Sequence, residues 1–357
     1  MSLPKYRIER SDFLKSKVLP TREPPVKVYH FRAFPLSVTS NYSETLPWFY
    51  SNFIQLKCTS EFIREKEMDF DFIAGDVFGG IPWLDYIKDI DKTMLNEDMN
   101  DVCQFVIKNI DNGYYIYTFV DEFFIPDRSA YKKYHRMHDI MVYGYDDSEK
   151  VFNVAGYNSK MKYAETKVDF ECFYNAFSSS EPNRNDKIVL FKKIDDVNYS
   201  FNIERVFEKL EDYLYSRDCS DKLEIYDFDG RTNRIKYLHQ LLKTENYVFG
   251  INVYEQLILF CEAMKNKYVF PDLRPFHCLL EHKSCMLGRL RYLAGQKYLK
   301  NIDELCNNYQ LIELEALTIR NMMVRMMLIR DFHSIEDVKH RLDKLSKDEY
   351  ALLSNLL

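Results

Sequence analysis

The chain has 357 residues, a formal net charge of −6 at pH 7 and 46% hydrophobic residues, a composition typical of a globular protein long enough for two domains. Acidic and basic residues are interspersed rather than gathered into a basic stripe, which argues against nucleic-acid binding. No apolar run reaches the roughly 20 residues that a membrane helix needs, and the first residues lack the apolar core of a signal peptide. We therefore expect a cytoplasmic protein without a membrane segment.

The eight cysteines are scattered along the chain, and none forms a Cys-x-x-Cys pair. The two closest, Cys278 and Cys285, are seven residues apart, a spacing that suits neither a zinc site nor a redox motif. We expect eight reduced and mostly buried thiols, no metal and no cofactor.

The first sixty residues predict an arm, a strand, a loop and a helix. Residues 1–25 end in two prolines and favour an extended conformation, because a residue before proline avoids the helical region. Alternation over residues 26–31 predicts a short strand, and residues 35–42 are typical of a loop. A helix should open at residues 43–48 and keep a buried face as far as Leu56.

The middle of the chain changes from helix to strand. A short helix is predicted over residues 98–111. The β-prone segments that follow are residues 114–120, 139–145, 150–155 and 188–193. A turn at residues 146–149 joins two of them directly, which predicts an antiparallel sheet.

Helical periodicity dominates after about residue 199. The predicted helices cover residues 201–215, 234–243, 253–265, 276–295, 301–330 and 334–356. We therefore expect an α+β protein with an N-terminal domain over residues 1–195 and an α-helical domain over residues 196–357.

One stretch of the N-terminal half carries several features in a fixed order. From Val120 to Asp147 the sequence has a Val-Asp start, a proline, an aromatic residue, His135-x-x-His138, a hydrophobic strand, Gly-Tyr-Asp-Asp and a returning strand. This order resembles the butirosin biosynthesis protein H family of acyltransferases and, more distantly, the bacteriocin-leader-processing cysteine peptidases. The resemblance extends loosely over residues 26–195 and implies a papain-like half-barrel, followed by an α-helical domain.

The resemblance also implies a catalytic arrangement. In that fold a cysteine at a helix N-terminus, where the thiol pKa is lowered, gives its proton to a histidine at the start of a sheet strand. An Asp or Asn on the neighbouring strand fixes the imidazole tautomer. The family histidine corresponds to His138, with His135 at the approach to the same strand.

The other two catalytic positions do not match the family. Tyr42 stands where the cysteine is expected, with Ser43 beside it, and the expected acid position falls on Ala155 or Gly156. Cys58 is about 11 residues beyond Pro47, roughly 16 Å along a continuous helix, which is too far for a hydrogen bond to the base. The candidate catalytic residues are therefore His138, His135, Ser43 and Tyr42.

Three functions stay open at this point. The resemblance implies acyl or aminoacyl transfer from a carrier-protein thioester to an amine in bacterial natural-product biosynthesis, of the nonribosomal-peptide or aminoglycoside type. His138 would then be the base, and Ser43 or direct attack by the acceptor would replace the thiol. The alternatives are a non-catalytic carrier-binding or scaffold protein of the same pathway and, third, a cysteine peptidase using Cys58.

A carrier protein is usually acidic, so its partner needs a basic face. Such a face is offered by the basic residues that are concentrated between residues 274 and 300, namely Arg274, Lys283, Arg289, Arg291, Lys297 and Lys300. The alternative is an ordinary solvated helix face, because exposed ion pairs contribute little to binding. The sequence indicates no oligomeric state.

Overall fold

A computed structural model of the chain describes residues 15–74, 78–95, 98–179, 187–222, 224–228, 233–237, 246–300 and 302–357. It divides into two compact units, neither continuous in sequence. The first unit comprises residues 1–24, 33–41 and 84–195, and the second comprises residues 25–32, 42–83 and 196–357. The boundary after residue 195 coincides with the predicted domain boundary. The division differs from the predicted one because residues 25–32 and 42–83 pack with the helical part.

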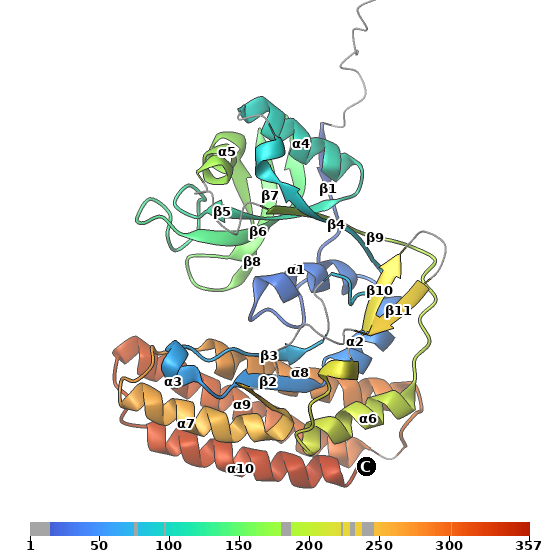
Figure 1. Cartoon of the computed structure of the whole chain (residues 1–357), viewed down its shortest axis with the longest axis vertical. Coiled ribbons are helices and arrows are strands. Elements are labelled where there is room, and N and C mark those ends of the chain that lie inside the picture. Colours follow the sequence, from blue (N-terminus) through green and yellow to red (C-terminus); the bar gives the residue numbers. More distant parts are fainter. Residues whose placement is uncertain are drawn as a thin grey trace, which may run out of the picture. The chain divides into compact units, whose positions relative to one another are not determined.

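The first unit is built on a large antiparallel sheet with the strand order β4-β9-β5-β6-β7-β8, and β1 also pairs with β6 (Figure 1). The strands are β1 (Ser16–Val18), β4 (Leu84–Asp91), β5 (Tyr115–Asp121), β6 (Met137–Asp146), β7 (Val151–Tyr157), β8 (Tyr163–Asp169) and β9 (Lys187–Lys193). The predicted antiparallel sheet is thus confirmed, while β1, β4 and β8 were not predicted.

Strand β6 pairs with β5 along its first half and with β1 at its end. The last residue that β5 pairs with is Val142, and β1 takes over at Gly144, which lies opposite Val18. A Cβ atom at Gly144 would come within 2.8 Å of the Lys17 carbonyl oxygen, a distance that real Cβ atoms do not adopt. Glycine at this position therefore permits the close approach of the N-terminal strand.

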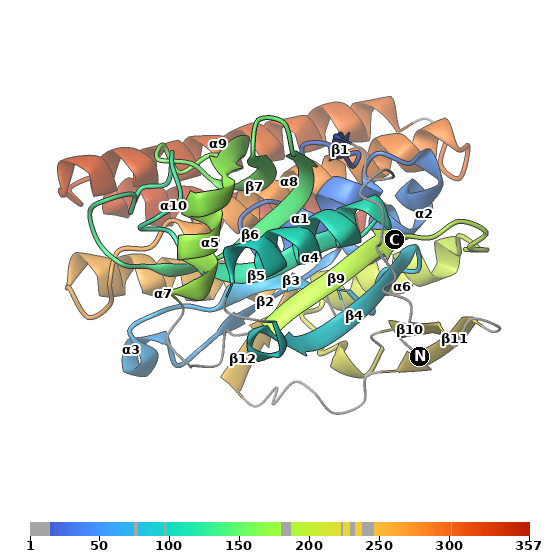
Figure 2. The same cartoon turned by 90° about the horizontal axis from the view of Figure 1, so that it is seen from above.

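Helices α4 (Met99–Asp111) and α5 (Phe170–Ser178) pack on the sheet of the first unit, as Figure 2 shows. The predicted helix over residues 98–111 is confirmed by α4. Its N-cap is Asp98, whose carboxylate accepts hydrogen bonds from two first-turn amides, and Val102, Val106 and Ile110 form its buried face. Lys92, in the short 3₁₀ helix η2 (Lys92–Met94), is buried and donates to the carbonyl oxygens of Phe119 and Phe177.

The N-terminal predictions are mostly wrong. The predicted arm lies outside the described residues as far as residue 14, and the predicted strand and loop give way to helix α1 (His30–Thr39). Ala33, Phe34 and Ser37 recur at helical spacing and are buried. This pattern outweighs the short alternation over residues 26–31, which is compatible with either structure.

The second unit contains the three-stranded antiparallel sheet β12-β2-β3, the hairpin β10-β11 and the large helices. Its strands are β2 (Gln55–Thr59), β3 (Phe70–Ile73), β10 (Glu224–Phe228), β11 (Asn233–Tyr237) and β12 (Tyr247–Phe249). Its helices are α2 (Leu46–Asn52), α3 (Phe62–Glu65), α6 (Ile203–Leu214), α7 (Val253–Lys265), α8 (Arg274–Gly295), α9 (Asp303–Ile329) and α10 (Ile335–Ser354), with 3₁₀ turns η1 (Ser43–Thr45), η3 (Ser220–Lys222) and η5 (Gly250–Asn252).

Five of the six predicted C-terminal helices are confirmed, by α6, α7, α8, α9 and α10. The helix predicted over residues 234–243 is wrong where the structure describes it, because residues 233–237 form β11; residues 238–243 lie outside the described residues. Helix α8 packs on β3, α2 and α9, and α10 packs on α7 and α9. Among the described residues, no helix has the length and apolar character to cross a membrane.

Candidate functional site

The two candidate histidines of the first unit lie where β5 returns into β6. Residues 122–136 connect the strands through successive turns, and Ile125 and Ala130 in this connection are fully buried. The Asp121 carboxylate accepts hydrogen bonds of 3.0 Å from the backbone amides of Phe123 and Arg136. One carboxylate therefore holds both ends of the connection together.

His135 is held by the same carboxylate. Its Nδ1 lies 2.5 Å from Asp121 Oδ2, and its ring stacks on Phe123 with centroids 4.4 Å apart. The imidazole side chain is 70% exposed while Asp121 is 4% exposed. Burial opposes ionisation of Asp121, but the bonds from His135 and the two amides outweigh it and lower the pKa of this carboxyl. In the neutral ring, donation from Nδ1 to Asp121 leaves Nε2 as the hydrogen-bond acceptor.

His138 is the second residue of β6 and lies opposite Val120 of β5. Its Nδ1 is 3.0 Å from Asp139 Oδ1 and 3.8 Å from Glu122 Oε1. Burial disfavours the charged ring, but the hydrogen bond and charge of Asp139, together with the charge of Glu122, raise the pKa of His138 above its ordinary value. The imidazole is thus supported by carboxylates, as in catalytic histidines.

The carboxylate beside His138 comes from an unexpected place. The sequence pattern pointed to Ala155 or Gly156 at the end of the returning strand, which offer no side-chain acceptor. The structure supplies Asp139, whose Oδ2 also accepts a 3.1 Å hydrogen bond from Tyr117, and Glu122 from the connection. The sequence offered one indication of this contact, because Asp139 directly follows His138.

Tyr42 and Ser43 belong to the second unit, whereas both histidines belong to the first. Ser43 is exposed at the start of η1, and Tyr42 precedes it with an extended backbone and no side-chain capping bond. The four predicted catalytic residues are therefore divided between the two units.

Cys58 lies in strand β2, so its predicted place on a continuous helix is wrong. Helix α2 ends at Asn52, and Phe53 leaves the helical region with ψ at 64°. Cys58 is then paired between Phe70 and Val248 and is fully buried. Burial raises the pKa of its thiol to about 12.

The other thiols share this property. All eight cysteines are free, as predicted. Burial is the first cause of a raised pKa at every one of them. A thiol nucleophile needs a lowered pKa or an adjacent base to form its thiolate. None of these eight side chains has the electrostatics of an activated nucleophile.

The second unit encloses a polar network with no exposure to solvent. Lys283 Nζ lies 2.7 Å and 2.8 Å from the two carboxylate oxygens of Glu349, and both side chains are 0% exposed. His282 accepts from Lys283 through Nδ1 and donates to the Ile54 carbonyl oxygen through Nε2. The same carboxylate also accepts hydrogen bonds from Tyr213, Tyr254 and Tyr309. The network joins helices α6, α7, α8, α9 and α10.

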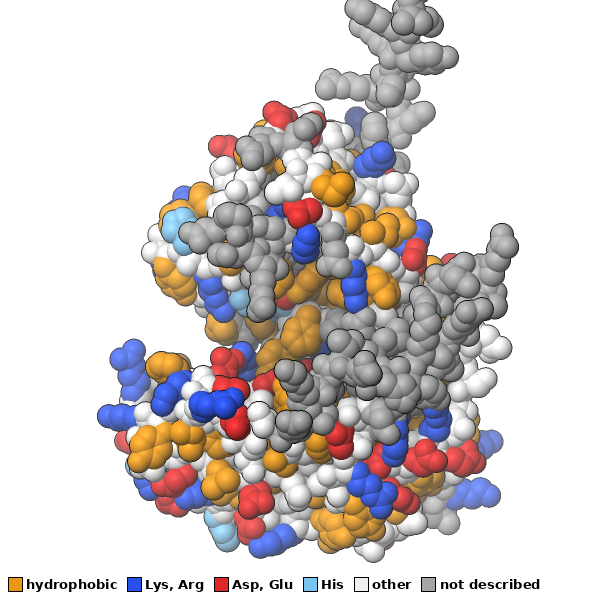
Figure 3. All heavy atoms as spheres, in the orientation of Figure 1, with side chains coloured by type: hydrophobic (Ala, Val, Ile, Leu, Met, Phe, Trp, Pro, Cys, Tyr) orange, Lys and Arg blue, Asp and Glu red, His pale blue; other side chains and the backbone are white. Residues whose placement is uncertain are grey.

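The predicted basic docking face is wrong. Lys283 and Arg289 are fully buried, and Arg289 donates to the carbonyl oxygens of Tyr50 and Phe53. Arg274 and Arg291 are exposed, and Arg274 is paired with Asp272 and Glu67. Two of the four cations on α8 therefore face the core, and the four do not form one exposed basic face. On the face in Figure 3, acidic and basic side chains are mixed.

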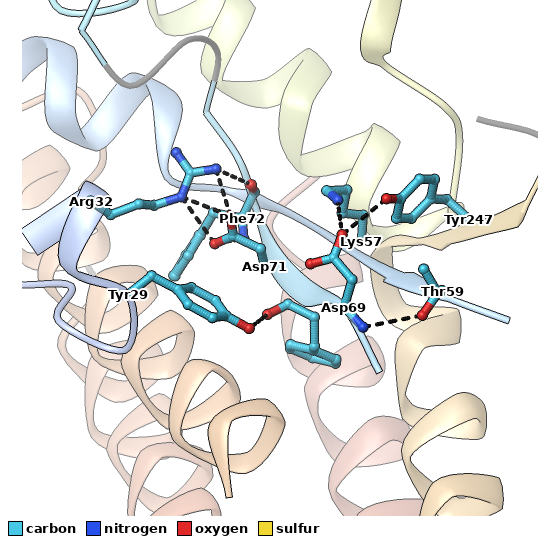
Figure 4. A network of polar contacts seen from close by, with 9 residues as sticks. Tyr29, Arg32, Lys57, Thr59, Asp69, Asp71, Phe72 and Tyr247 are labelled. Carbon is cyan, nitrogen blue, oxygen red and sulfur yellow. Dashed lines mark hydrogen bonds and ion pairs between the residues drawn. The ribbon is translucent and has the colours of Figure 1, made fainter. Parts of the chain in front are cut away.

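A second polar network of this unit is drawn in Figure 4. Arg32 forms a two-pronged ion pair with Asp71 and also donates to the Phe72 carbonyl oxygen. Lys57 Nζ lies 2.6 Å from Asp69, which also accepts a hydrogen bond from Tyr247. Tyr29 donates to the Phe70 carbonyl oxygen, and Thr59 accepts from the Asp69 amide. The charged groups are paired, and the network ties residues 25–32 and β12 to β2 and β3.

Comparison with protein-family models and with curated proteins returns no match. The candidate site therefore stands on its own geometry. That geometry consists of two histidines on one strand connection, each with Nδ1 against a carboxylate.

Proposed function

We propose that the protein is an acyl- or aminoacyl-transferase of papain-like ancestry that acts in the cytoplasm, in bacterial natural-product biosynthesis. The observation that carries the proposal is the position of His138 at the start of β6, with Nδ1 held 3.0 Å from Asp139. A carboxylate on Nδ1 fixes the tautomer in which Nε2 is the base, which is the arrangement that general-base catalysis requires.

In the proposed reaction, an acceptor amine attacks the carbonyl carbon of a carrier-protein thioester. The new C–N bond forms as the C–S bond breaks. His138 Nε2 takes the proton from the attacking nitrogen and returns it to the leaving thiolate. Asp139 and Glu122 stabilise the imidazolium that forms between these two steps, because both carboxylates lie within 4 Å of Nδ1.

Direct attack by the acceptor is favoured over a cysteine intermediate. The raised pKa of every thiol argues against a peptidase that uses Cys58. Ser43, an exposed hydroxyl, is the remaining candidate for a covalent step. The same lack of an activated thiol also favours the second candidate function, a carrier-binding scaffold without turnover. Both candidate functions include binding of a carrier protein, but neither assigns that binding to the basic residues of α8.

The test is a transfer assay with aminoacyl carrier-protein thioesters and an amine acceptor. His138→Gln should lower the rate by about 10²- to 10⁴-fold, the usual effect of losing a general base. His333→Gln is the matched control, because His333 is exposed in the second unit and lies against Asp331. The wild-type rate should rise with pH through the raised pKa of His138, since the neutral ring is the base.

Two outcomes would decide against the enzyme. Carrier binding without turnover in the wild-type protein would support the scaffold. Equal rates for His138→Gln and wild type would remove His138 from the chemistry.

A further inference from the structure

Arg128, in the connection between β5 and β6, is a buried arginine. The residue is 3% exposed. In the part of the chain that the structure describes, neither Nη1 nor Nη2 has a hydrogen-bond partner. Burial lowers the pKa of Arg128, although the charges of Glu122 and Asp127 oppose this change. An arginine charge withdrawn from water without partners is strongly unfavourable.

Lys92 and Arg289, two other buried cations, have hydrogen-bond partners. Lys92 in the same unit is 8% exposed and donates to the carbonyl oxygens of Phe119 and Phe177, and it lies 4.3 Å from the Phe177 ring centroid. Arg289 in the second unit donates to two carbonyl oxygens and to the Met286 sulfur. Arg128 differs because both ends of its planar fork are unpaired. A planar fork with two adjacent donors matches an anion that accepts two parallel hydrogen bonds.

The charges around Arg128 indicate which anion fits. Glu122 interacts electrostatically with Arg128 and with His138. Its Oε2 is buried without a hydrogen bond and has Arg136 Nη1 at 3.6 Å. A dianionic phosphate beside this carboxylate would be repelled more strongly than a singly charged group. The surroundings therefore favour a carboxylate.

We propose that Arg128 binds the carboxylate of a small ligand, next to Glu122 and His138. This role deepens the proposed function, since it rests on His138 as the base and assigns a carboxylate to the substrate that reacts there. Carboxylate binding itself needs no turnover, so it is measured separately from catalysis. The connection that carries Arg128 is anchored near both ends by Asp121, which accepts from the Phe123 and Arg136 amides and so ties this backbone to the start of β6.

The first measurement uses acetate as the probe. Carbon-13 acetate should show line broadening with the full-length protein, with half-saturation in the millimolar range, because a ligand of so few atoms gains little affinity. Arg128→Met should abolish the broadening, and Arg128→Lys should weaken it through loss of the two-pronged geometry. Arg22→Met, an exposed arginine of the same unit, should have no effect. Inorganic phosphate at equal ionic strength should compete poorly.

The second measurement compares thermal midpoints without ligand. Arg128→Met should unfold at the wild-type temperature or above it, because the variant removes an unpaired buried charge. Lys92→Met should unfold at a lower temperature, because it removes the hydrogen bonds that Lys92 donates to the Phe119 and Phe177 carbonyl oxygens. Acetate should raise the midpoint of wild type and of His138→Gln, but not that of Arg128→Met.

Each result counts for or against the proposal. Acetate broadening that persists in Arg128→Met, or phosphate that binds more tightly than acetate, would overturn it. A fall in the midpoint of Arg128→Met as large as that of Lys92→Met would show that Arg128 has a structural role instead. Acetate binding in a protein without transferase activity would keep the carboxylate site and remove only the proposed reaction.

Discussion

Two pairs of buried charged residues, one pair in each unit, are arranged in opposite ways. In the second unit, Lys283 and Glu349 are fully buried, and the carboxylate is further bonded by three tyrosines. In the first unit, Arg128 and Glu122 are almost as deeply buried, yet among the described residues Arg128 Nη1, Arg128 Nη2 and Glu122 Oε2 have no hydrogen-bond partner. Buried charges with complete sets of partners are explained by the fold alone, whereas incomplete sets require another explanation.

Whether a buried charged group has all its hydrogen-bond partners separates structural from functional residues better than residue type does. Lys283 and His282 on α8 are residue types that often form catalytic pairs. Both are fully buried, however, and their hydrogen bonds go to other groups of the protein. His138 and Asp139 on β6 also combine residue types of this kind, but they lie beside groups with unmet hydrogen-bonding capacity. The following predictions test this comparison.

The largest effect is expected from breaking the buried network around Lys283 and Glu349. Lys283→Met leaves the Glu349 carboxylate buried without its cation and should lower the free energy of unfolding by about 3–5 kcal/mol. Urea unfolding followed by circular dichroism measures this loss. Lys347→Met is the control, because Lys347 is 74% exposed and its pair with Asp343 should contribute less than about 1 kcal/mol. Similar stabilities of the two variants would show that the network is dispensable.

Asp121→Asn should have the next largest effect, because Asp121 accepts bonds from His135 and two backbone amides. We expect a loss of about 2 kcal/mol at pH 7, as is usual for hydrogen bonds to a charged group. The pKa of Asp121 is lowered in the folded state, so its contribution is present above the unfolded value of about 3.9 and is lost as the pH falls through the folded pKa. The difference between wild type and variant should therefore shrink in acid. A constant difference would assign the loss to packing.

Asp139→Asn should lower the pKa of His138, because burial then opposes the charged ring without the neighbouring carboxylate. In wild type the raised pKa stabilises the fold below the unfolded value of about 6.5, and this contribution is lost as the pH rises through the folded pKa. The stability gap between wild type and Asp139→Asn should thus be widest in mild acid and narrow above neutral pH. Titration of the His138 ring by NMR measures the pKa directly, and an unchanged value would exclude Asp139 as its cause.

The smallest effect is expected at Cys58. Iodoacetamide should leave this thiol unlabelled in the native protein, because the side chain is fully buried and its pKa is raised to about 12. Cys172 and Cys306 are partly exposed and should react first. Peptide mapping after timed labelling distinguishes the three sites. Rapid labelling of Cys58 with loss of transfer activity would identify it as the nucleophile.

The long periodic elements were predictable from sequence, and the short ones were not. The helices α7 and α10 fall within one or two residues of the predicted ranges, because apolar residues recur over many turns. The strand β2 was taken for the end of a helix, because Ile54 and Leu56 also fit a helical face. Residues 42–83 were assigned to the N-terminal half, since sequence adjacency says nothing about which distant helices cover a strand.

The candidate site was predictable in part. His138 and His135 were found through the order of features around them, and the structure gives each a carboxylate. The role of Asp121 in holding His135 was not predictable. It depends on how residues 122–136 fold, since this connection brings Arg136 and His135 back to the Asp121 carboxylate. The burial of Lys283 and Arg289 was missed because charged residues on a helix normally face solvent, whereas α8 is enclosed by α2, α9 and β3.

The interleaved division of the chain has a consequence for its synthesis. Strands β2 and β3 leave the ribosome long before α7 and α8, the helices that pack on them. Until residue 295 has been made, β3 lacks α8, the helix that packs on it, although Phe70 and Phe72 are fully buried in the finished fold. A nascent chain that ends at residue 195 lacks α6, α7 and α8, so we expect β2 and β3 to be exposed and prone to aggregation at that stage.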